Sequence, residues 1–484
     1  MIRYFFIAIF LLFSLPIFSL AQTITYSELL KENIKDDDLQ IIGKVNGNIL
    51  IFKNAKNDYS IFVYDNEMKL KETVPLDFLP GKTFKVNFIA YPNFTYLIYE
   101  YQNKKIVYAA GVKLDEEGKV IGQPVTIDSA DVSGHTTNTY TIVNSEDRKK
   151  IMFIKTAKQN NILTLATTLM DNNLQIINRT SQAFSYNEEK NILDNPSLDN
   201  DGNFVCTLSS KMSEREHFNE LSLITKSAMT DSFTTNNIEL KGRYTNTVFL
   251  KVDNINKHYI LNTFFYTERK GNAQGILANV WDKESNAPMS NTAIIFSDTV
   301  KTSLKKEGRS NEAFNNFIIR KVITQKDGGY ILMAEDYFML QATVNNYYNQ
   351  FYNPMNPFGF NNTQTINTYY AKNIFVVNID KQGKPAWNNV VIKNQYSEIN
   401  DDALSFSAFT TGGEIHMYYN QLVKKVQSLS DNSIKPDGEI IQNADISPKR
   451  DYAFLPKYAK QVGAKQFIIP CVYHNSTGFV KIDY

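Results

Sequence analysis

Residues 373–393 read NIFVVNIDKQGKPAWNNVVIK and are the clearest copy of a pattern that recurs along the chain. Ile374 to Val377 form a short run of β-branched and aromatic residues that is typical of a strand. Asp380 and Gly383 then supply turn residues, and a second strand-like segment follows. A run that is apolar at every position is buried on both faces, whereas a one-sided strand alternates. The stretch therefore predicts a hairpin inside a stack of sheets.

The same order of strand, acidic turn and strand recurs along the chain. Further copies are IFVYDNEMKLKETVPL at 61–76, AAGVKLDEEGKVIGQPVTI at 109–127 and ATTLMDNNLQIINRTSQAF at 166–184. The turn acids Asp65, Asp115, Asp171 and Asp282 lie 50, 56 and 111 residues apart, and the last interval holds two units. The period is thus about 50 to 57 residues, which is the size of a four-stranded repeat.

Helical periodicity is nearly absent, and its best candidate, residues 27–34, is only two turns long. Units of four strands at this period resemble those of β-propeller repeat proteins in general, although no WD, kelch or Asp-box signature is present. The resemblance implies an all-β fold, a β-propeller of about eight four-stranded blades. We place the blades near residues 39–80, 84–128, 138–184, 191–240, 245–296, 315–396, 401–444 and 451–484.

The last unit shows only three strands, so residues 23–26 are expected to supply its fourth strand and close the ring. Two alternatives remain open. The sixth unit is swollen by an insertion, which leaves seven blades possible, and tandem β-sandwiches would give a similar pattern of short strands.

The first 21 residues have the order of a secretory signal peptide. Arg3 is followed by a nearly unbroken apolar run to Leu15, and small residues stand at Ser19 and Ala21. We therefore expect export to the periplasm, cell surface or medium, with Gln22 as the mature N-terminus. Residues 22–484 are then a single propeller domain with no membrane span.

Composition excludes several function classes. Lys and Arg number 51 against 50 Asp and Glu, and no basic block occurs, which argues against nucleic acid as a partner. The two cysteines, Cys206 and Cys471, fall in apolar contexts of different units and are expected to be reduced and buried. No Cys/His cluster has metal spacing, so we predict no metal and no cofactor.

The sharpest local feature is the insertion at residues 341–371, which contains no charged residue. A long insertion in a compact domain is usually functional or disordered, and tyrosine with asparagine suits recognition of a sugar or peptide. It is expected to lie between complete strands of the sixth unit. The candidate ligand-binding residues are its eight aromatics, Tyr347, Tyr348, Phe351, Tyr352, Phe358, Phe360, Tyr369 and Tyr370.

Carboxylate pairs could support glycoside hydrolysis, and the sequence offers two, Glu335 with Asp336 and Asp401 with Asp402. Nothing in the sequence sets their separation in space, and acids that close strands are ordinarily turn formers. Residues 199–203 (DNDGN) resemble the start of a calcium loop but lack its closing glutamate, so a blade turn explains them equally well.

The five histidines, which are expected to be hydrogen-bonded or exposed, are His135, His217, His258, His416 and His474. With no catalytic residue assigned, the first expectation is a non-catalytic extracytoplasmic binding or scaffold protein. Its protein or glycan partner would meet the axial face and the 341–371 insertion, and the oligomeric state is open. The alternative is a secreted hydrolase of carbohydrate or ester substrates, which two or more buried acids converging at the axial mouth would favour.

Overall fold

The computed structural model describes residues 22–31, 37–55, 57–132, 139–304, 313–345, 363–423, 426–449, 451–474 and 476–484. The expected signal sequence, and six of the eight aromatics proposed for ligand binding, lie outside these residues. Within them the chain forms eight antiparallel sheets, which confirms the all-β fold and the count of eight blades.

The first four blades have four strands each, in order from the inner to the outer strand. They are β2 (Asp37–Val45), β3 (Asn48–Ala55), β4 (Asp58–Tyr64) and β5 (Leu70–Pro75); β6 (Thr83–Ala90), β7 (Thr95–Asn103), β8 (Ile106–Leu114) and β9 (Val120–Asp131); β10 (Tyr140–Asn144), β11 (Lys150–Gln159), β12 (Ile162–Asp171) and β13 (Ile176–Ser185); and β14 (Asn191–Leu198), β15 (Phe204–Ser210), β16 (Glu220–Lys226) and β17 (Thr234–Ile238).

The other four blades follow the same order, with an extra short strand in blade 6 and a divided inner strand in blade 8. They are β18 (Tyr244–Asp253), β19 (His258–Tyr266), β20 (Ala273–Asp282) and β21 (Ala287–Ile295); β22 (Phe317–Thr324), β23 (Tyr330–Asn345), β24 (Thr363–Ile379), β25 (Pro385–Val391) and β26 (Gln395–Ser397); β27 (Phe406–Thr410), β28 (Ile415–Val423), β29 (Val426–Ile434) and β30 (Ile440–Gln442); and β31 (Ala453–Phe454), β32 (Lys460–Gly463), β33 (Gln466–Tyr473), β34 (Ser476–Asp483) and β1 (Thr23–Tyr26).

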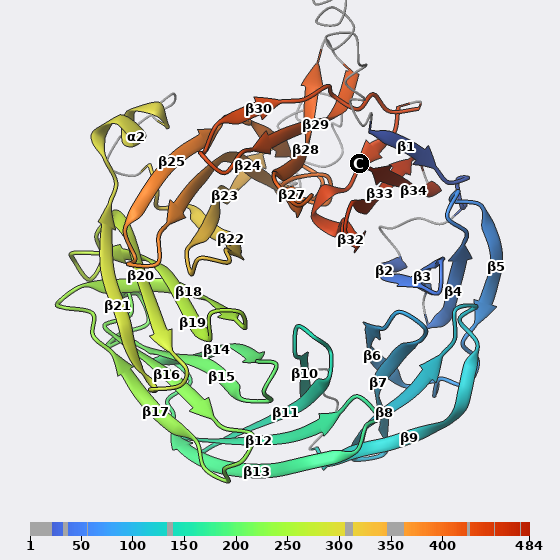
Figure 1. Ribbon diagram of the computed structural model, residues 1–484, viewed down its shortest axis with the longest axis horizontal. Helices are drawn as coiled ribbons and strands as arrows, with labels where there is room; N and C mark the ends of the chain where they lie inside the picture. Colours follow the sequence, from blue (N-terminus) through green and yellow to red (C-terminus); the bar gives the residue numbers. More distant parts are fainter. Residues whose placement is uncertain are drawn as a thin grey trace, which may run out of the picture.

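The blades stand around a common axis, with their first strands at the centre and their outer strands on the rim (Figure 1). The ring therefore has two faces. The connection face carries the links from each outer strand to the next blade, together with the hairpins between second and third strands. The turn face carries the other two turns of each blade.

The ring closes as expected, because β1 pairs with β34 and completes blade 8 from the opposite end of the sequence. Thr23 lies opposite Asp483, and Tyr26 lies opposite Val480. Seven blades and tandem sandwiches are both excluded by this single ring of eight sheets (Figure 1).

Side chains of neighbouring blades form the hydrophobic core, which is divided among the eight seams of the ring. The apolar run at the start of residues 373–393, in β24, shows why its residues are all apolar. Phe375 and Val377 pack in the seam with blade 5, while Ile374 and Val376 pack in the seam with blade 7. Each blade is thus buried on both faces, and burial of the apolar area at these seams holds the ring together.

The turn acids serve the backbone. In the turns that follow Asp65, Asp115, Asp171 and Asp380, the Oδ1 atom of the aspartate accepts hydrogen bonds from the N–H groups two and four residues further on. This capping of a tight turn explains the repeated acid without any catalytic role.

Residues 27–31, part of the best candidate for helical periodicity, contain no helix, and Leu30 forms a bridge to Thr477. Short helices occur at α2 (Asp298–Ser303), capped by the Ser297 side chain, and at the 3₁₀ turn η2 (Pro456–Tyr458). No helix of the described residues is long and apolar enough to cross a membrane.

The insertion also differs from the expected loop between complete strands. β23 and β24 continue into it and pair as far as Asn345 opposite Thr363. Ala371, at its other end, is fully buried. The described ends of the insertion therefore belong to blade 6 itself. Thr and Asn are common in exposed ribbons as well as in loops, which is why the sequence did not separate the two.

Cys206 and Cys471 are unpaired and buried in blades 4 and 8, as expected. Burial raises the pKa of both thiols, that of Cys471 to about 12, so neither is a reactive thiolate near neutral pH.

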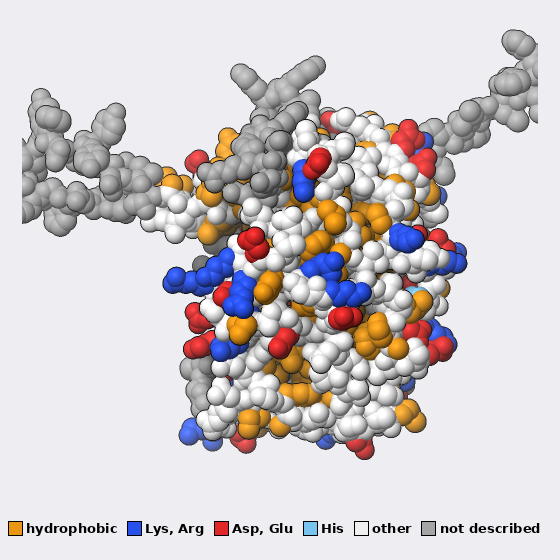
Figure 2. Space-filling model, turned by 90° about the vertical axis from the view of Figure 1, so that its left-hand side faces the viewer, with side chains coloured by type: hydrophobic (Ala, Val, Ile, Leu, Met, Phe, Trp, Pro, Cys, Tyr) orange, Lys and Arg blue, Asp and Glu red, His pale blue; other side chains and the backbone are white. Residues whose placement is uncertain are grey.

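The outer wall on the left-hand side of Figure 1 carries acidic and basic side chains interspersed with hydrophobic ones (Figure 2). No broad surface of one charge is visible on this wall, in keeping with the formal net charge of +1.

Candidate functional site

A network of charged side chains lies on the connection face, where blade 6 meets blades 7 and 8. Glu335, on β23, is its centre and is fully buried. Its Oε2 atom accepts hydrogen bonds from Arg320 Nε at 2.9 Å and from Ser405 Oγ at 2.6 Å. Its Oε1 atom lies 2.8 Å from Lys393 Nζ. A buried carboxylate needs such partners, because desolvating an unpaired charge costs several kcal/mol.

Lys393 ties this acid to the link between blades 6 and 7. Its ammonium donates to the Ala371 carbonyl and to Gln395 Oε1, both at 2.9 Å. Gln395 Oε1 also accepts from the backbone N–H of Ser405 at 2.9 Å. Burial lowers the pKa of Lys393, although the nearby Glu335 carboxylate opposes this shift. The lysine thus fixes the course of the link that carries the second acid pair.

Arg320 extends the network to that second pair. Its guanidinium lies over the Tyr337 ring, 4.8 Å from the ring centroid. The Tyr337 hydroxyl donates to Asp401 Oδ2 at 2.8 Å, and Lys457 Nζ, from η2, lies 2.8 Å from Asp401 Oδ1. The neighbouring Asp402 accepts from the Tyr458 hydroxyl at 2.6 Å. Glu335 of the first acid pair and both acids of the second pair are therefore joined in one network, and Asp336 follows Glu335 directly on β23.

Two carboxyl groups in or beside this network differ in their proton affinity. Burial raises the pKa of Asp336 to about 6; the positive charges of Lys372 and Lys393 oppose this shift, and the adjacent Glu335 charge adds to it. Among the described residues, no hydrogen bond or ion pair reaches the Asp336 carboxyl. Asp401 has the opposite behaviour. Burial would raise its pKa, but hydrogen bonds from Lys457 and Tyr337 outweigh burial and lower it.

Aromatic side chains stand beside Asp336 on the same ribbon. Phe338 and Tyr370 are stacked with ring centroids 4.8 Å apart, and the Tyr396 ring follows at 6.2 Å. Tyr396 is 66% exposed. Of the eight aromatics proposed from the sequence, Tyr370 belongs to this stack, and Tyr369 pairs with Ser397 in the sheet.

The remaining six proposed residues fall outside the part of the chain that the structure describes. They are Tyr347, Tyr348, Phe351, Tyr352, Phe358 and Phe360. Sequence reasoning missed Arg320, Tyr337, Lys393 and Lys457. Only one signal pointed toward them, namely that the two acid pairs flank the insertion and the link after it.

A second buried network lies on the turn face, between blades 7 and 8. His416 Nδ1 lies 3.0 Å from Asp431 Oδ1, and Asp431 Oδ2 accepts from the Tyr484 hydroxyl at 2.6 Å. Gln22 Nε2 donates to the Tyr418 hydroxyl at 2.8 Å, and Tyr418 OH also contacts Asp431. The network joins residues from both ends of the described chain.

Other sequence candidates have structural roles. Asp199 Oδ1 accepts from the N–H groups of Asp201 and Asn203, and its Oδ2 lies 2.5 Å from Lys283 Nζ. A lysine therefore takes the place that a cation would fill in a calcium loop. No group of three His, Cys, Asp or Glu side chains within the described ranges has metal-binding geometry.

Three described histidines follow the expectation: His217 bonds to the Gly271 carbonyl and stacks on Tyr266, His416 belongs to the turn-face network, and His474 is exposed. The expectation was wrong for His258, which is buried and whose Nδ1 atom has no hydrogen-bond partner among the described residues. His135 lies in a segment that the structure does not describe.

No protein-family model matches the chain, and no curated protein matches it. Among solved structures it is similar to prolyl oligopeptidase B from Galerina marginata, with 8% identity and a TM-score of 0.40 over 92% of this chain. It is also similar to oligopeptidase B from Trypanosoma brucei, with 9% identity and a TM-score of 0.40 over 91%. The chain spans 56% and 54% of the lengths of these two proteins.

These neighbours are peptidases by name, and they correct the expectation of a non-catalytic binding or scaffold propeller, which was wrong by this comparison. At such low identity and TM-score, the likeness assigns no activity or substrate to this chain. Any chemistry has to be argued from its own side chains.

Proposed function

We propose that this protein is a hydrolase that cleaves glycosidic bonds, with Asp336 as general acid and Asp401 as the ionised carboxylate. The observation that carries the proposal is the opposite displacement of two pKa values, that of Asp336 beside the network to about 6 and that of Asp401 in the network below its usual range. Pairs of carboxyl groups whose environments separate their pKa values mark acid and base roles.

The chemistry needs both forms at once. A protonated carboxyl donates its proton to the leaving-group oxygen, while an ionised carboxylate activates water or attacks the anomeric carbon. Asp336 supplies the first form up to about pH 6. Asp401 supplies the second, because Lys457 and Tyr337 stabilise its charge.

Glu335 has a positioning role in this scheme. It is fully buried among Arg320, Ser405 and Lys393 and so is not available to a substrate, whereas the Asp401 side chain is 35% exposed. It orients Arg320 against Tyr337. The stacked rings ending at the exposed Tyr396 offer apolar faces of the kind on which sugar rings pack.

The test is hydrolysis of a panel of p-nitrophenyl glycosides and oligosaccharides by the full chain and by Asp336→Asn and Asp401→Asn. Each variant is expected to lose about 10²–10⁴-fold in kcat/KM on oligosaccharides. Asp336→Asn should lose far less on a p-nitrophenyl glycoside, because that leaving group needs little protonation. Asp58→Asn, which changes an exposed acid in blade 1, is the matched control.

Activity should also depend on pH in a defined direction. Asp336 must be protonated, so kcat/KM should fall as pH rises through about 6. Asp401 must be ionised, so activity should fall only well into the acid range. A fully active Asp336→Asn variant, or an unchanged rate between pH 5 and 8, would contradict the assignment. Cleavage of esters or prolyl peptides, without cleavage of glycosides, would show that the proposed substrate class is wrong.

Export belongs to the same proposal. The order of Arg3, the apolar run and Ser19 to Ala21 supports cleavage before Gln22 and a location outside the cytoplasm. Intact-mass measurement of the protein recovered from its native envelope or medium tests this. A mass that retains residues 1–21 would contradict it.

A further inference from the structure

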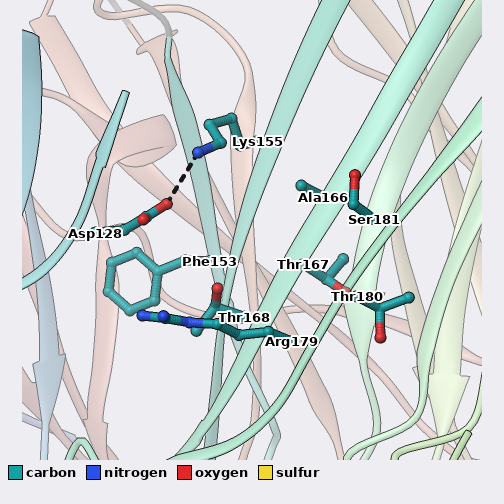
Figure 3. Close-up of a pocket in the computed structure, with 9 residues that line it drawn as sticks. All are labelled: Asp128, Phe153, Lys155, Ala166, Thr167, Thr168, Arg179, Thr180 and Ser181. Carbon is teal, nitrogen blue, oxygen red and sulfur yellow. Dashed lines mark hydrogen bonds and ion pairs between the residues drawn. The ribbon is translucent and has the colours of Figure 1, made fainter. Parts of the chain in front are cut away.

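A pocket between blades 2 and 3 lies apart from the acid network of blades 6 to 8. Its volume is about 260 Å³. Figure 3 shows the side chains that line it, which come mainly from β11, β12 and β13, with one from β9 of the preceding blade. They are Asp128, Phe153, Lys155, Ala166, Thr167, Thr168, Arg179, Thr180 and Ser181.

The acid of this pocket is already neutralised. Lys155 Nζ lies 3.2 Å from Asp128 Oδ2 and also donates to the Ser129 carbonyl at 3.4 Å (Figure 3). The buried Tyr140 lies close to the same carboxylate. Its pKa is raised first by burial and then by the negative charge of Asp128. Asp128 and Lys155 therefore form a pair with no net charge.

Arg179 is the uncompensated charge. One of its five N–H donors, on Nη2, bonds to the Ile127 carbonyl at 3.3 Å. Within the described ranges, no carboxylate forms an ion pair with it. The buried Phe153 ring lines the same pocket (Figure 3). A planar fork with open donors at the edge of a pocket matches the geometry of a carboxylate.

Two hydroxyl groups share this face of blade 3. Thr168 lies directly opposite Arg179 in the pairing of β12 with β13, and Ser181, two residues after Arg179, projects to the same face. Thr168 is largely buried, so its position is fixed by the sheet. The pocket thus combines one open cation with two hydroxyl groups and one apolar ring.

We infer that this pocket binds a carboxylate-bearing ligand of the size of one sugar ring, a uronic acid, with its carboxylate on Arg179. A volume near 260 Å³, just below the range of about 300–1,000 Å³ for ligand pockets, suits a ligand of one ring. The Thr168 and Ser181 hydroxyls meet the ring hydroxyls. Recognition of the carboxylate stands on the pocket alone, whereas the choice of a sugar acid rests on the proposed glycosidase function.

The experiment is calorimetric titration of the full chain with D-galacturonate, D-galactose and succinate. Galacturonate should bind, and its affinity should fall as salt is added, while galactose should bind at least about tenfold more weakly. Arg179→Gln should lose about tenfold or more, and Arg179→Lys should recover only part of the affinity because an ammonium lacks the fork. Arg215→Gln, at an exposed arginine of blade 4, is the matched control.

The outcomes separate this inference from the proposed function. Equal binding of galacturonate and galactose, unchanged affinity in Arg179→Gln, or no galacturonate binding would overturn the site. If succinate bound as tightly as galacturonate, the choice of a sugar acid would be wrong, while recognition of a carboxylate by Arg179 would stand. Asp336→Asn should bind galacturonate like the parent protein, since that residue lies in blade 6.

Discussion

Two buried acids, Glu335 on the connection face and Asp431 on the turn face, stand in networks of similar size but different surroundings. The Asp431 carboxylate is hydrogen-bonded to His416, Tyr418 and Tyr484. The Glu335 carboxylate also has three partners, in Arg320, Ser405 and Lys393. Directly after it, however, Asp336 is placed where burial raises its pKa to about 6.

The difference distinguishes a network in which the buried acid is fully paired from one that also places a second, unpaired acid beside it. In the turn-face network every group contributes to holding blades 7 and 8 and both ends of the described chain together. In the connection-face network, Glu335 is well paired, but burial destabilises the ionised form of its neighbour Asp336. Such a local loss of stability is expected where a residue is kept for its chemistry.

The largest expected effect comes from removing a cation of the connection-face network. Lys393→Met should lower the free energy of unfolding by about 3–5 kcal/mol, because it leaves the fully buried Glu335 short of a partner. Denaturant unfolding of the variant measures this. Lys435→Met, which breaks an exposed pair with Glu439, should leave the free energy of unfolding nearly unchanged. Similar losses in the two variants would show that burial does not distinguish these pairs.

Next in size is Asp431→Asn, which should lower the free energy of unfolding by about 1–3 kcal/mol, because the amide replaces an acceptor of several hydrogen bonds. Glycosidase activity should stay unchanged. The matched control is Glu414→Gln, which alters the more distant acid 3.9 Å from His416 Nε2. A drop in activity without loss of stability would make the turn-face network functional and break the comparison.

Asp336→Asn should act in the opposite direction on stability. The folded-state pKa of Asp336 is raised, so the stabilising contribution of its protonated form is present at low pH and is lost as pH rises through about 6. Above that pH the neutral amide should therefore raise the free energy of unfolding, by on the order of 1 kcal/mol. Thermal unfolding at pH 5 and pH 8 tests the sign. A variant that is less stable at pH 8 would place Asp336 with the structural acids.

The smallest effect is expected from shortening the ribbon beside the acid network. Replacing residues 346–362 by Asn-Gly should change the free energy of unfolding by less than about 1 kcal/mol, because Asn345 and Thr363 are paired and a short turn can join them. Removal of residues 341–371 should cost more, since Ala371 is buried and its carbonyl accepts from Lys393. Equal losses of stability in the two deletion variants would contradict the strand boundary at Asn345 and Thr363.

The sequence was sufficient for the ring because the signals for it are local. A turn aspartate that accepts hydrogen bonds from nearby backbone N–H groups, as Asp115 and Asp380 do, recurs in several blades. Continuously apolar runs such as Ile374 to Val377 predict directly that the strand is buried on both faces of its sheet. Even the closing strand could be placed, because one unit lacked its fourth strand.

The acid network could not be predicted in the same way, because it depends on contacts between blades. Tyr337 and Asp401 are 64 residues apart, and Asp401 and Lys457 are 56 apart. These side chains come together only because of the path of the link after blade 6, which is held by the hydrogen bond from Lys393 Nζ to the Ala371 carbonyl. No periodicity in the sequence predicts such a path. The aromatic insertion drew attention to the correct blade, whereas the acids at its base carry the proposed chemistry.

Closure of blade 8 by β1 has a consequence for the order in which the molecule can be assembled. Ser27, directly after β1, bonds to Phe479, which is 452 residues away along the chain. Blades 1 to 7 are built from contiguous segments and can form one after another during synthesis or translocation, but β1 has no neighbour until β34 has appeared. For that whole interval an unpaired strand edge is exposed, which invites aggregation. Slow, late formation of the last seam is therefore built into the topology, and helper proteins that shield strand edges should matter most for this step.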